Sequence, residues 1–276
     1  MDERVAANRA NWDDRVPIHL ASRFYDVDGW LAREPLPIER EATLIGNVAG
    51  KTLVHLQCHI GLETLQWARA GAQVTGVDFS RAAVDAATNL AARAGLSSRA
   101  TFLCADVYEA DTALDAHAFD VVYVSLGSLG WLPDIRLWAQ VVGHALAAGG
   151  TFFIHDVHPM SSCFDEDGER VVYGYFEESG RPFVSDDDST YTDGGPLAHV
   201  RNYEWNHSLG EITQALLDQG LVIDVLQEHD WTVFQQFPWL VEDAGTYRIA
   251  DGRPRVPLTF TLVAHAPIIA TSPTRH

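Results

Sequence analysis

Apolar residues recur in short runs that alternate with helix-like patterns between residues 52 and 155. Runs rich in Val, Leu, Phe and Tyr are typical of strands buried on both faces. The pattern predicts strands over Thr52–Gln57, Gln73–Val77, Ala100–Cys104, Phe119–Val124 and Thr151–His155, and helices over Leu62–Ala70, Arg81–Ala94 and Ile135–Leu146. This alternation predicts right-handed crossovers and an α/β fold with a mostly parallel sheet.

The flanking segments have a different pattern. Residues 1–47 are predicted to form a helical N-terminal cap that is rich in aromatic side chains. The alternation stops at residues 158–205, a segment too long for a bare connection, which we interpret as a lid-like insertion. We expect a single domain over residues 1–276.

The C-terminal third is predicted to complete the sheet. A helix over Ser208–Gln219 precedes a sixth strand over Leu221–Glu228. The alternating run Pro257–His265 predicts a last, antiparallel edge strand, and residues 266–276 are expected to form a loose tail.

Two stretches indicate a ligand site. Residues 53–61, Leu-Val-His-Leu-Gln-Cys-His-Ile-Gly, predict a buried strand that runs into a turn and a helix, and residues 74–80 predict a second strand that ends at Asp78. A loop at a helix N-terminus beside a carboxylate at the next strand end is how open α/β sheets bind adenosine-type ligands. The carboxylate accepts hydrogen bonds from ribose hydroxyls.

Composition narrows the ligand and the location. The formal net charge is −19, from 38 acidic and 19 basic residues, which argues against nucleic acid and anionic membranes and favours a small neutral or cationic substrate. Three cysteines, Cys58, Cys104 and Cys163, give no disulfide framework, so a reducing cytoplasm is expected. No stretch approaches the length of a membrane span.

The motif series resembles that of the class I S-adenosylmethionine-dependent methyltransferases, over roughly residues 50–157. The matching features are Gly61 of the first loop, Asp78, Asp106-Val107 after the third strand, Phe119-Asp120-Val121-Val122, and the turn Leu146 to Gly150. The chain departs from the family where His55 replaces an acidic residue, Gln57 and His59 replace glycines, and Ala148 replaces a proline.

The resemblance implies a Rossmann-like seven-stranded sheet with an antiparallel last strand, and S-adenosyl-L-methionine as cofactor. It implies cofactor contacts from nine residues: Gln57, Cys58, His59, Gly61, Asp78, Phe79, Asp106, Val107 and Ser125. The replacement of glycines by Gln57 and His59 fits a ligand without phosphate. Glycines are needed where the backbone must approach a pyrophosphate closely, and S-adenosylmethionine has none. A nicotinamide-dependent oxidoreductase is disfavoured by the same loop, and by the lack of a Tyr-x-x-x-Lys pair in a chain whose only lysine is Lys51.

Candidates for the chemistry lie in the cap and at the ends of the fourth and fifth strands. His19, Tyr25 and His158 are candidate catalytic residues, with a histidine as proton acceptor. Trp12, Trp30, Gly127 and His207 are candidate substrate contacts. The bland alternatives are core aromatics, a mere turn at Gly127, a helix-capping His207 and a hydrogen-bonded structural His158. No metal is expected at His155-Asp156-Val157-His158, because this spacing in a loop is poor evidence for one.

The sequence leaves the acceptor open. The Leu-Gln-Cys-His loop and the segment His207 to Ile212 resemble a bacterial small-molecule subgroup, in which indole C3-methylation in secondary metabolism is one possibility. O- or N-methylation of another small, aromatic or heterocyclic metabolite and a non-catalytic S-adenosylmethionine-binding regulator are the alternatives. No Asn/Asp-Pro-Pro-Tyr motif occurs, which argues against methylation of the amino groups of nucleobases or glutamine by that route. The sequence does not predict the oligomeric state.

Overall fold

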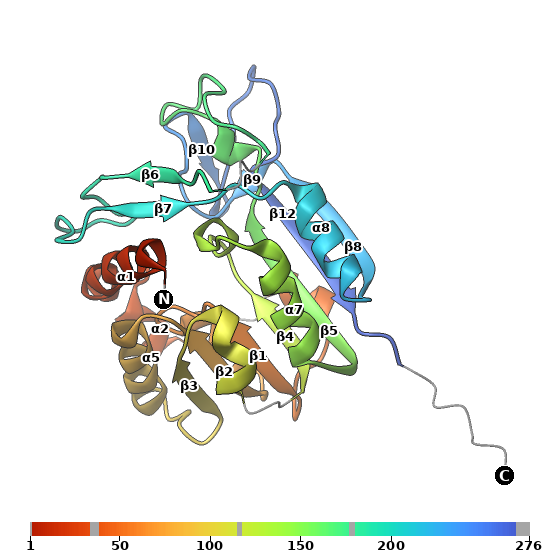
Figure 1. Ribbon diagram of the computed structural model, residues 1–276. Helices are drawn as coiled ribbons and strands as arrows, with labels where there is room; N and C mark the ends of the chain where they lie inside the picture. The colour runs from red at the N-terminus through yellow and green to blue at the C-terminus, as the bar shows by residue number, and fades with distance from the viewer. Residues whose placement is uncertain (1, 34–38, 115–117, 177–179, 269–276) are drawn as a thin grey trace, which may run out of the picture.

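A seven-stranded sheet forms the centre of the protein (Figure 1), which we describe from a computed structural model covering residues 2–33, 39–114, 118–176 and 180–268. The strand order is β3-β2-β1-β4-β5-β12-β8. In this order the bounds are Ala100–Cys104, Gln73–Asp78, Thr52–Leu56, Phe119–Val124, Leu146–Val157, Thr259–His265 and Val222–His229. The predicted Rossmann-like, mostly parallel sheet is confirmed.

The C-terminal strands differ in position from the prediction. β12 is antiparallel, as expected, but it lies between β5 and β8 and is not an edge strand. Six of its residues in a row are buried, whereas β8 leaves side chains such as Val222 and Leu226 exposed along the edge. The continuous apolar character of β12 is what a strand covered on both faces requires.

Helices cover both faces of the sheet (Figure 1). Their bounds are α1 Glu3–Ala21, α2 Val27–Ala32, α3 Glu39–Ile45, α4 Leu62–Arg69, α5 Arg81–Arg93, α6 Ala110–Ala113, α7 Ile135–Ala145 and α8 Leu209–Asp218, with short 3-10 turns η1 Val107–Glu109, η2 Leu129–Trp131 and η3 Ser161–Cys163. Successive strand residues point to opposite faces. In β4, Val122 and Val124 pack with α7 and α8, while Val121 and Tyr123 pack with α3 and α4.

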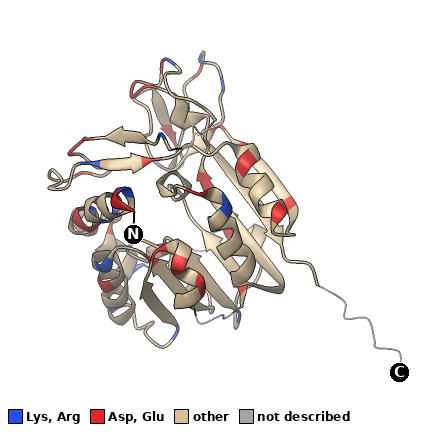
Figure 2. Ribbon diagram, in the orientation of Figure 1, with Lys and Arg blue, Asp and Glu red and all other residues tan. Residues whose placement is uncertain are grey.

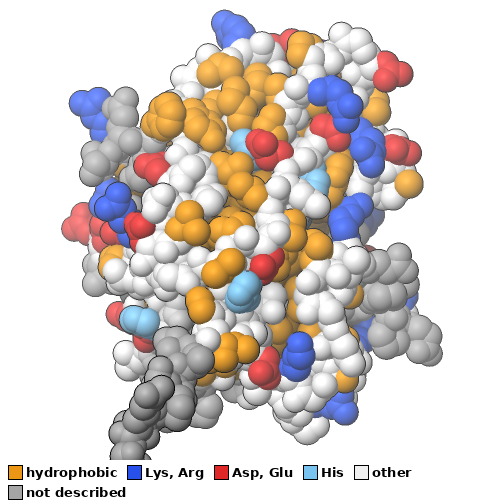
Figure 3. Space-filling model, turned by 90° about the vertical axis from the view of Figure 1, so that its right-hand side faces the viewer, with side chains coloured by type: hydrophobic (Ala, Val, Ile, Leu, Met, Phe, Trp, Pro, Cys, Tyr) orange, Lys and Arg blue, Asp and Glu red, His pale blue; other side chains and the backbone are white. Residues whose placement is uncertain are grey.

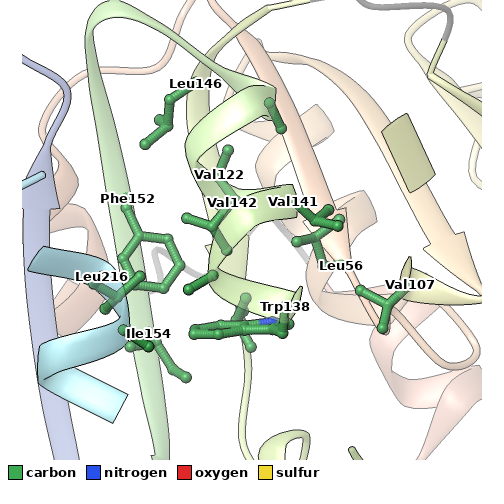
Figure 4. Packing of buried hydrophobic residues seen from close by; sticks show 14 of the residues in the cluster. Leu56, Val107, Val122, Trp138, Val141, Val142, Leu146, Phe152, Ile154 and Leu216 are labelled. Carbon is green, nitrogen blue, oxygen red and sulfur yellow. The ribbon is translucent and has the colours of Figure 1, made fainter. Parts of the chain in front are cut away.

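The larger core lies between the sheet and the helix pair α7 and α8 (Figure 4). Trp138 of α7 packs there with Phe152 and Ile154 of β5 and with Leu216 of α8. All four side chains are essentially excluded from solvent. Burial of this kind stabilises the folded state by roughly 1.5–3 kcal/mol per large side chain. The core therefore fixes the positions of β4 and β5, and with them the start of the loops that follow these two strands.

The cap helix α1 and a hairpin from the predicted insertion lie side by side (Figure 1). The hairpin pairs β6, Phe183–Ser185, with β7, Asn202–Glu204. Asn8 of α1 donates its amide to the carbonyl oxygen of Tyr203 and accepts from the Tyr203 N–H, both at 2.8 Å. The division into cap, insertion and tail remains a prediction, and residues 269–276 of the tail lie outside the described residues.

A second small sheet follows β8, in a region for which the sequence predicted no structure. It consists of β9 Trp231–Thr232, β10 Leu240–Asp243 and β11 Thr246–Ile249. Residues of this region, Val233 and Phe234, reach the cavity described below. Within the described residues, no helix is long and apolar enough to span a membrane.

Charged and apolar side chains are mixed on the surface. In the view of Figure 2, Lys and Arg segments are scattered among Asp and Glu segments. Figure 3, turned by 90° toward the side of α8 and β8, shows hydrophobic side chains interspersed with acidic, basic and histidine side chains. This view therefore shows no strongly basic face.

Asp156, near the end of β5, holds the loop that follows β4. Its carboxylate is buried and accepts hydrogen bonds from the backbone N–H groups of Gly127 at 2.5 Å, Ser128 at 3.2 Å and Leu129 at 3.0 Å. One side chain thus satisfies three backbone donors of a turn that would otherwise be buried without partners.

We predict that Asp156→Ala lowers the free energy of unfolding by about 3 kcal/mol, because it leaves these N–H groups buried and unsatisfied. Asp156→Asn, which keeps one oxygen acceptor, should lose less. Urea denaturation measures both variants, with the exposed Asp251→Ala as control. A value for Asp156→Ala within 0.5 kcal/mol (roughly the scatter of surface substitutions) of wild type would contradict this role.

Candidate functional site

A cavity of about 510 Å³ lies at the carboxyl ends of β1, β2 and β4. This is the position at which open α/β sheets bind ligands, and the volume is within the range of small-molecule sites. Its walls come from the loop after β1, the end of β2, the turn after β3, the loop after β4 and aromatic residues of the cap and the later loops.

The loop after β1 has a glycine-like backbone without being glycine-rich. Gln57 and His59 have φ angles of 59° and 48°, in the left-handed region, as does Gly61 at 76°. Non-glycine residues rarely adopt this conformation, at a cost of about 1–3 kcal/mol each. At Gly61 a side chain is also excluded by space, because a Cβ would lie 2.7 Å from the Phe102 ring and 2.8 Å from the Ala87 Cβ.

Asp78 ties this loop to the second strand. Its carboxylate accepts from the His59 N–H at 2.8 Å and from the Ser80 N–H at 2.9 Å. Burial raises the pKa of Asp78 to about 6, although the two backbone hydrogen bonds act in the opposite direction. An ionised carboxylate here has lone pairs left over for hydroxyl donors in the cavity.

The sequence-predicted cofactor residues come together. All nine line the cavity: Gln57, Cys58, His59, Gly61, Asp78, Phe79, Asp106, Val107 and Ser125. Gln57 donates its amide to the Ser128 carbonyl oxygen at 2.8 Å, whereas its own Oε1 is buried and has no partner among the described residues. That oxygen is an acceptor available to a bound ligand. The roles of these residues remain predictions.

Glu63, which the sequence analysis did not single out, supplies a further carboxylate to the cavity. Burial raises its pKa, and a hydrogen bond with Ser125 lowers it. Ser125 also contacts His55 Nε2 at 3.0 Å, and His55 Nδ1 contacts the Thr64 hydroxyl at 2.8 Å. The signal that could have found Glu63 is an acid in the first turn of a helix that starts at a ligand loop.

The cap contributes Trp12 and Tyr25 to the cavity wall. Trp12 meets His59 and Trp131 edge-on, with ring centroids 5.1 and 5.2 Å apart. The hydroxyl of Tyr25 lies 2.5 Å from that of Tyr191. Burial raises the pKa of Tyr25 well above its usual value, so this hydroxyl is neutral at physiological pH. Trp131 and Phe234 were missed because they come from separate loops that only the fold brings together.

His19 is buried behind the cavity wall. It does not line the cavity; its Nδ1 lies 2.8 Å from His59 Nε2 and its Nε2 lies 2.8 Å from the Thr190 hydroxyl. Burial, reinforced by Arg15, lowers the pKa of His19 to about 3. His19 thus reaches the cavity through lining residues such as His59 and Tyr25, and its role as a proton acceptor remains a prediction.

Three other candidates lie away from this cavity. Trp30 packs on the Arg69 guanidinium, 3.7 Å from its ring centroid. His158 is buried and lines neither cavity; its Nδ1 accepts from the Met160 N–H, and its Nε2 lies 3.0 Å from a Glu228 carboxylate oxygen. Its substrate-facing role remains a prediction.

His207 lines a second cavity of about 550 Å³, and its Nε2 donates to the Leu132 carbonyl oxygen at 2.6 Å. The two cavities share Gly127, Trp131 and Val157 in their walls. The second cavity lies between the loop after β4, the β6–β7 hairpin and the segment after β5. Among the described residues no group of three or more His, Cys, Asp or Glu side chains is placed to hold a metal.

Comparisons with known proteins match the motif region. Residues 54–150 match the family described as the methyltransferase domain. A 23S rRNA uracil-C5 methyltransferase from Nitrosospira multiformis is 27% identical over an alignment of 190 residues. The alignment covers 58% of this chain and 43% of that protein. The chain therefore spans less than half the length of this relative.

Solved structures share the fold. An S-adenosylmethionine-dependent methyltransferase from Mesorhizobium loti is 19% identical with a TM-score of 0.53, covering 85% of this chain and 99% of that one. One from Clostridium acetobutylicum is 14% identical with a TM-score of 0.55, covering 92% and 96%. A glycopeptide N-methyltransferase complexed with S-adenosyl-L-methionine is 17% identical with a TM-score of 0.52, covering 83% and 92%.

We predict that the His19–His59 pair stays neutral between pH 5 and 8. Burial lowers the pKa of both rings, and a shared hydrogen bond needs one protonated and one unprotonated nitrogen. Histidine-selective NMR, with signals assigned by loss in His19→Gln and His59→Gln variants, checks this. A titration of either ring near the ordinary pKa of about 6.5 would contradict it.

Proposed function

We propose that this chain, a class I S-adenosylmethionine-dependent methyltransferase by its fold and its methyltransferase domain, methylates a small aromatic or heterocyclic metabolite. The observation that carries the proposal is the pair of cavities that meet at Gly127, Trp131 and Val157. The first has the polar groups for the cofactor, and the second is walled by aromatic side chains that suit a flat acceptor.

The polar groups of the first cavity support an assignment of residues along the whole cofactor. We assign Asp78 to the ribose hydroxyls, and Asp106, Val107 and Phe79 to the adenine. The methionine end falls to Gln57, Glu63 and Ser125, because the free Gln57 Oε1 and the Glu63 carboxylate are acceptors suited to an ammonium group. In this assignment Glu63 replaces the carboxylate that the family has where this chain has His55.

The cofactor supplies an electrophilic methyl group, and the chain's contribution is alignment. Gly127, held by Asp156, lines both cavities, and its lack of a side chain leaves room there for reacting atoms about 3–3.5 Å apart. Tyr25, paired with Tyr191, is placed to donate a hydrogen bond. The neutral His59 is the histidine of the first cavity that could accept a proton, in place of His19 or His158.

The acceptor class follows from size and charge. Two cavities of about 510 and 550 Å³ suit small molecules. The net charge of −19 disfavours nucleic acid, although the distant relative acts on 23S rRNA. The glycopeptide N-methyltransferase supports a small-molecule acceptor by analogy of fold alone. Within this proposal indole C3-methylation is one specific form, and O- or N-methylation is its alternative.

The decisive experiment has two readouts. Calorimetric titration with S-adenosylhomocysteine and with NAD should give binding of the former and not the latter. A mass-spectrometric screen of aromatic and heterocyclic metabolites with S-adenosylmethionine should give a product heavier by one methylene, 14 mass units. Absence of S-adenosylhomocysteine binding would refute the cofactor assignment. Binding without any product across the screen would favour a non-catalytic regulator.

For the cofactor assignment we predict that Asp78→Ala weakens S-adenosylhomocysteine binding at least tenfold, about 1.4 kcal/mol or more, because charge-assisted hydrogen bonds to the ribose are lost. Asp85→Ala, an exposed carboxylate on α5, serves as control and should bind like wild type. If Asp78→Ala and wild type have equal affinity in calorimetry, the assignment of Asp78 to the ribose is wrong.

The pKa of Asp78 predicts a pH dependence. The folded value of about 6 lies above the ordinary 3.8, so the carboxyl is ionised above pH 6 and protonated below it. Because ribose hydroxyls bind the ionised form better, affinity for S-adenosylhomocysteine should fall by roughly tenfold from pH 7 to pH 5. Asp78→Asn, which cannot titrate, should show a flatter profile. Identical profiles would assign the titration to another group.

A further inference from the structure

Glu204, the last residue of β7, puts a carboxylate without a partner into the second cavity. None of the described residues gives its side chain a hydrogen bond or an ion pair, and its pKa is raised by burial and lowered only by the charge of Arg15. Glu204 is half-buried at the cavity wall, and a carboxylate partly removed from water is costly unless a cation or donor compensates it. This side chain therefore lacks a partner that its surroundings call for.

Arg15 does not fill that place. Its guanidinium donates to Asn11 at 2.7 Å and to the Thr190 hydroxyl at 3.0 Å. It also lies over the rings of Trp12 and Trp131, 5.3 and 5.7 Å from their centroids, and lines neither cavity. Arg15 favours the ionised form of Glu204 from behind the aromatic wall, but it makes no salt bridge with it.

The other charged side chains that line the second cavity either have hydrogen-bond or ion-pair partners or lie at its exposed rim. Asp156 binds the backbone of the loop after β4, and Asp165 pairs with Arg170 at 3.1 Å. Glu166 is exposed at the rim, and Arg181, the one cation in the described lining, has an interaction of its own. The lining thus holds four carboxylates against one guanidinium, which favours a cationic ligand.

Aromatic side chains surround the same space. Trp131 and Trp205 line it together with Tyr173, Phe176 and Phe183. Such walls stack flat rings and attract cations to their faces. A carboxylate beside aromatic faces is the chemistry that recognises an ammonium group carried on a short side chain of an aromatic ring.

We propose that the acceptor is an arylalkylamine in its protonated form, and that Glu204 binds its ammonium group while the aromatic wall holds its ring next to Gly127 and Val157. This inference rests on the proposed function, because it names the acceptor class of that reaction. It makes Glu204 a specificity-determining residue that contacts the acceptor through its charge and takes no part in methyl transfer itself.

The test uses two matched pairs of probes that differ in one group: tryptamine against tryptophol, and 2-phenylethylamine against 2-phenylethanol. Each is titrated calorimetrically into the full chain saturated with S-adenosylhomocysteine, and also into the free protein. The amine of at least one pair should bind at least tenfold more tightly than its alcohol. Glu204→Gln should abolish that preference, and Glu204→Asp, which keeps the charge, should retain its direction.

Glu166→Gln is the matched control, because it removes the same charge from the exposed rim of the same cavity. It should leave the preference for the amine within about twofold of wild type. Thermal unfolding of each variant confirms that the fold is intact before binding is compared.

The outcomes separate the two proposals. If S-adenosylhomocysteine does not bind but the free protein prefers amines through Glu204, the proposed function fails and the cation site stands. If S-adenosylhomocysteine binds and amines and alcohols bind alike, the inference is overturned. It is also overturned if neither amine binds at millimolar concentration, or if folded Glu204→Gln keeps the preference, which would leave Glu204 as a distant counter-charge for Arg15.

Discussion

The hydrogen bonds that Asp78 accepts from the backbone N–H groups of His59 and Ser80 tie the end of β2 to the loop after β1. That loop holds two non-glycine residues, Gln57 and His59, at positive φ, a conformation that persists only where surrounding contacts compensate its cost. One of those contacts is the Asp78 carboxylate itself. The same side chain that we assign to the ribose therefore also keeps the loop in the shape that opens the cavity.

Asp156 has the corresponding role on the other side of the cavity. It accepts hydrogen bonds from the N–H groups of the loop after β4, and so it fixes Gly127, which lines both cavities, and Ser128, which lines the first. Both carboxylates stand at the carboxyl ends of strands, where the packed core beneath them sets their positions. The part of the site that these carboxylates fix is thus built on β2, β4 and β5, while the acceptor side that we propose is built on loops and the cap.

This division explains what the sequence could predict. The sheet and the meeting of the nine predicted residues in one cavity follow from local signals, since these residues stand at or just after strand ends and parallel strands bring those ends to one edge. The sequence placed β12 at the edge because its alternation of Thr with Phe and Leu resembles a strand with one exposed face. In the structure β12 pairs with β5 and β8 on its two sides, and six of its consecutive residues are buried. The small sheet of β9, β10 and β11 was missed because strands of two to four residues carry no measurable periodicity.

The aromatic side chains of the cap and the later loops show the limit of such prediction. Trp12 and Trp30 look alike in the sequence, yet Trp12 faces the cavity and Trp30 packs on Arg69, because only the packing of α1 and α2 decides their directions. Tyr191 meets Tyr25 across 166 residues of sequence separation. Glu204 belongs to no sequence motif. Its lack of a partner can be seen only from the packing of the β6–β7 hairpin against α1. The specificity that we propose for the acceptor therefore depends on the part of the chain where sequence patterns are least informative, whereas the proposed cofactor side follows from strand ends that any doubly wound sheet must have.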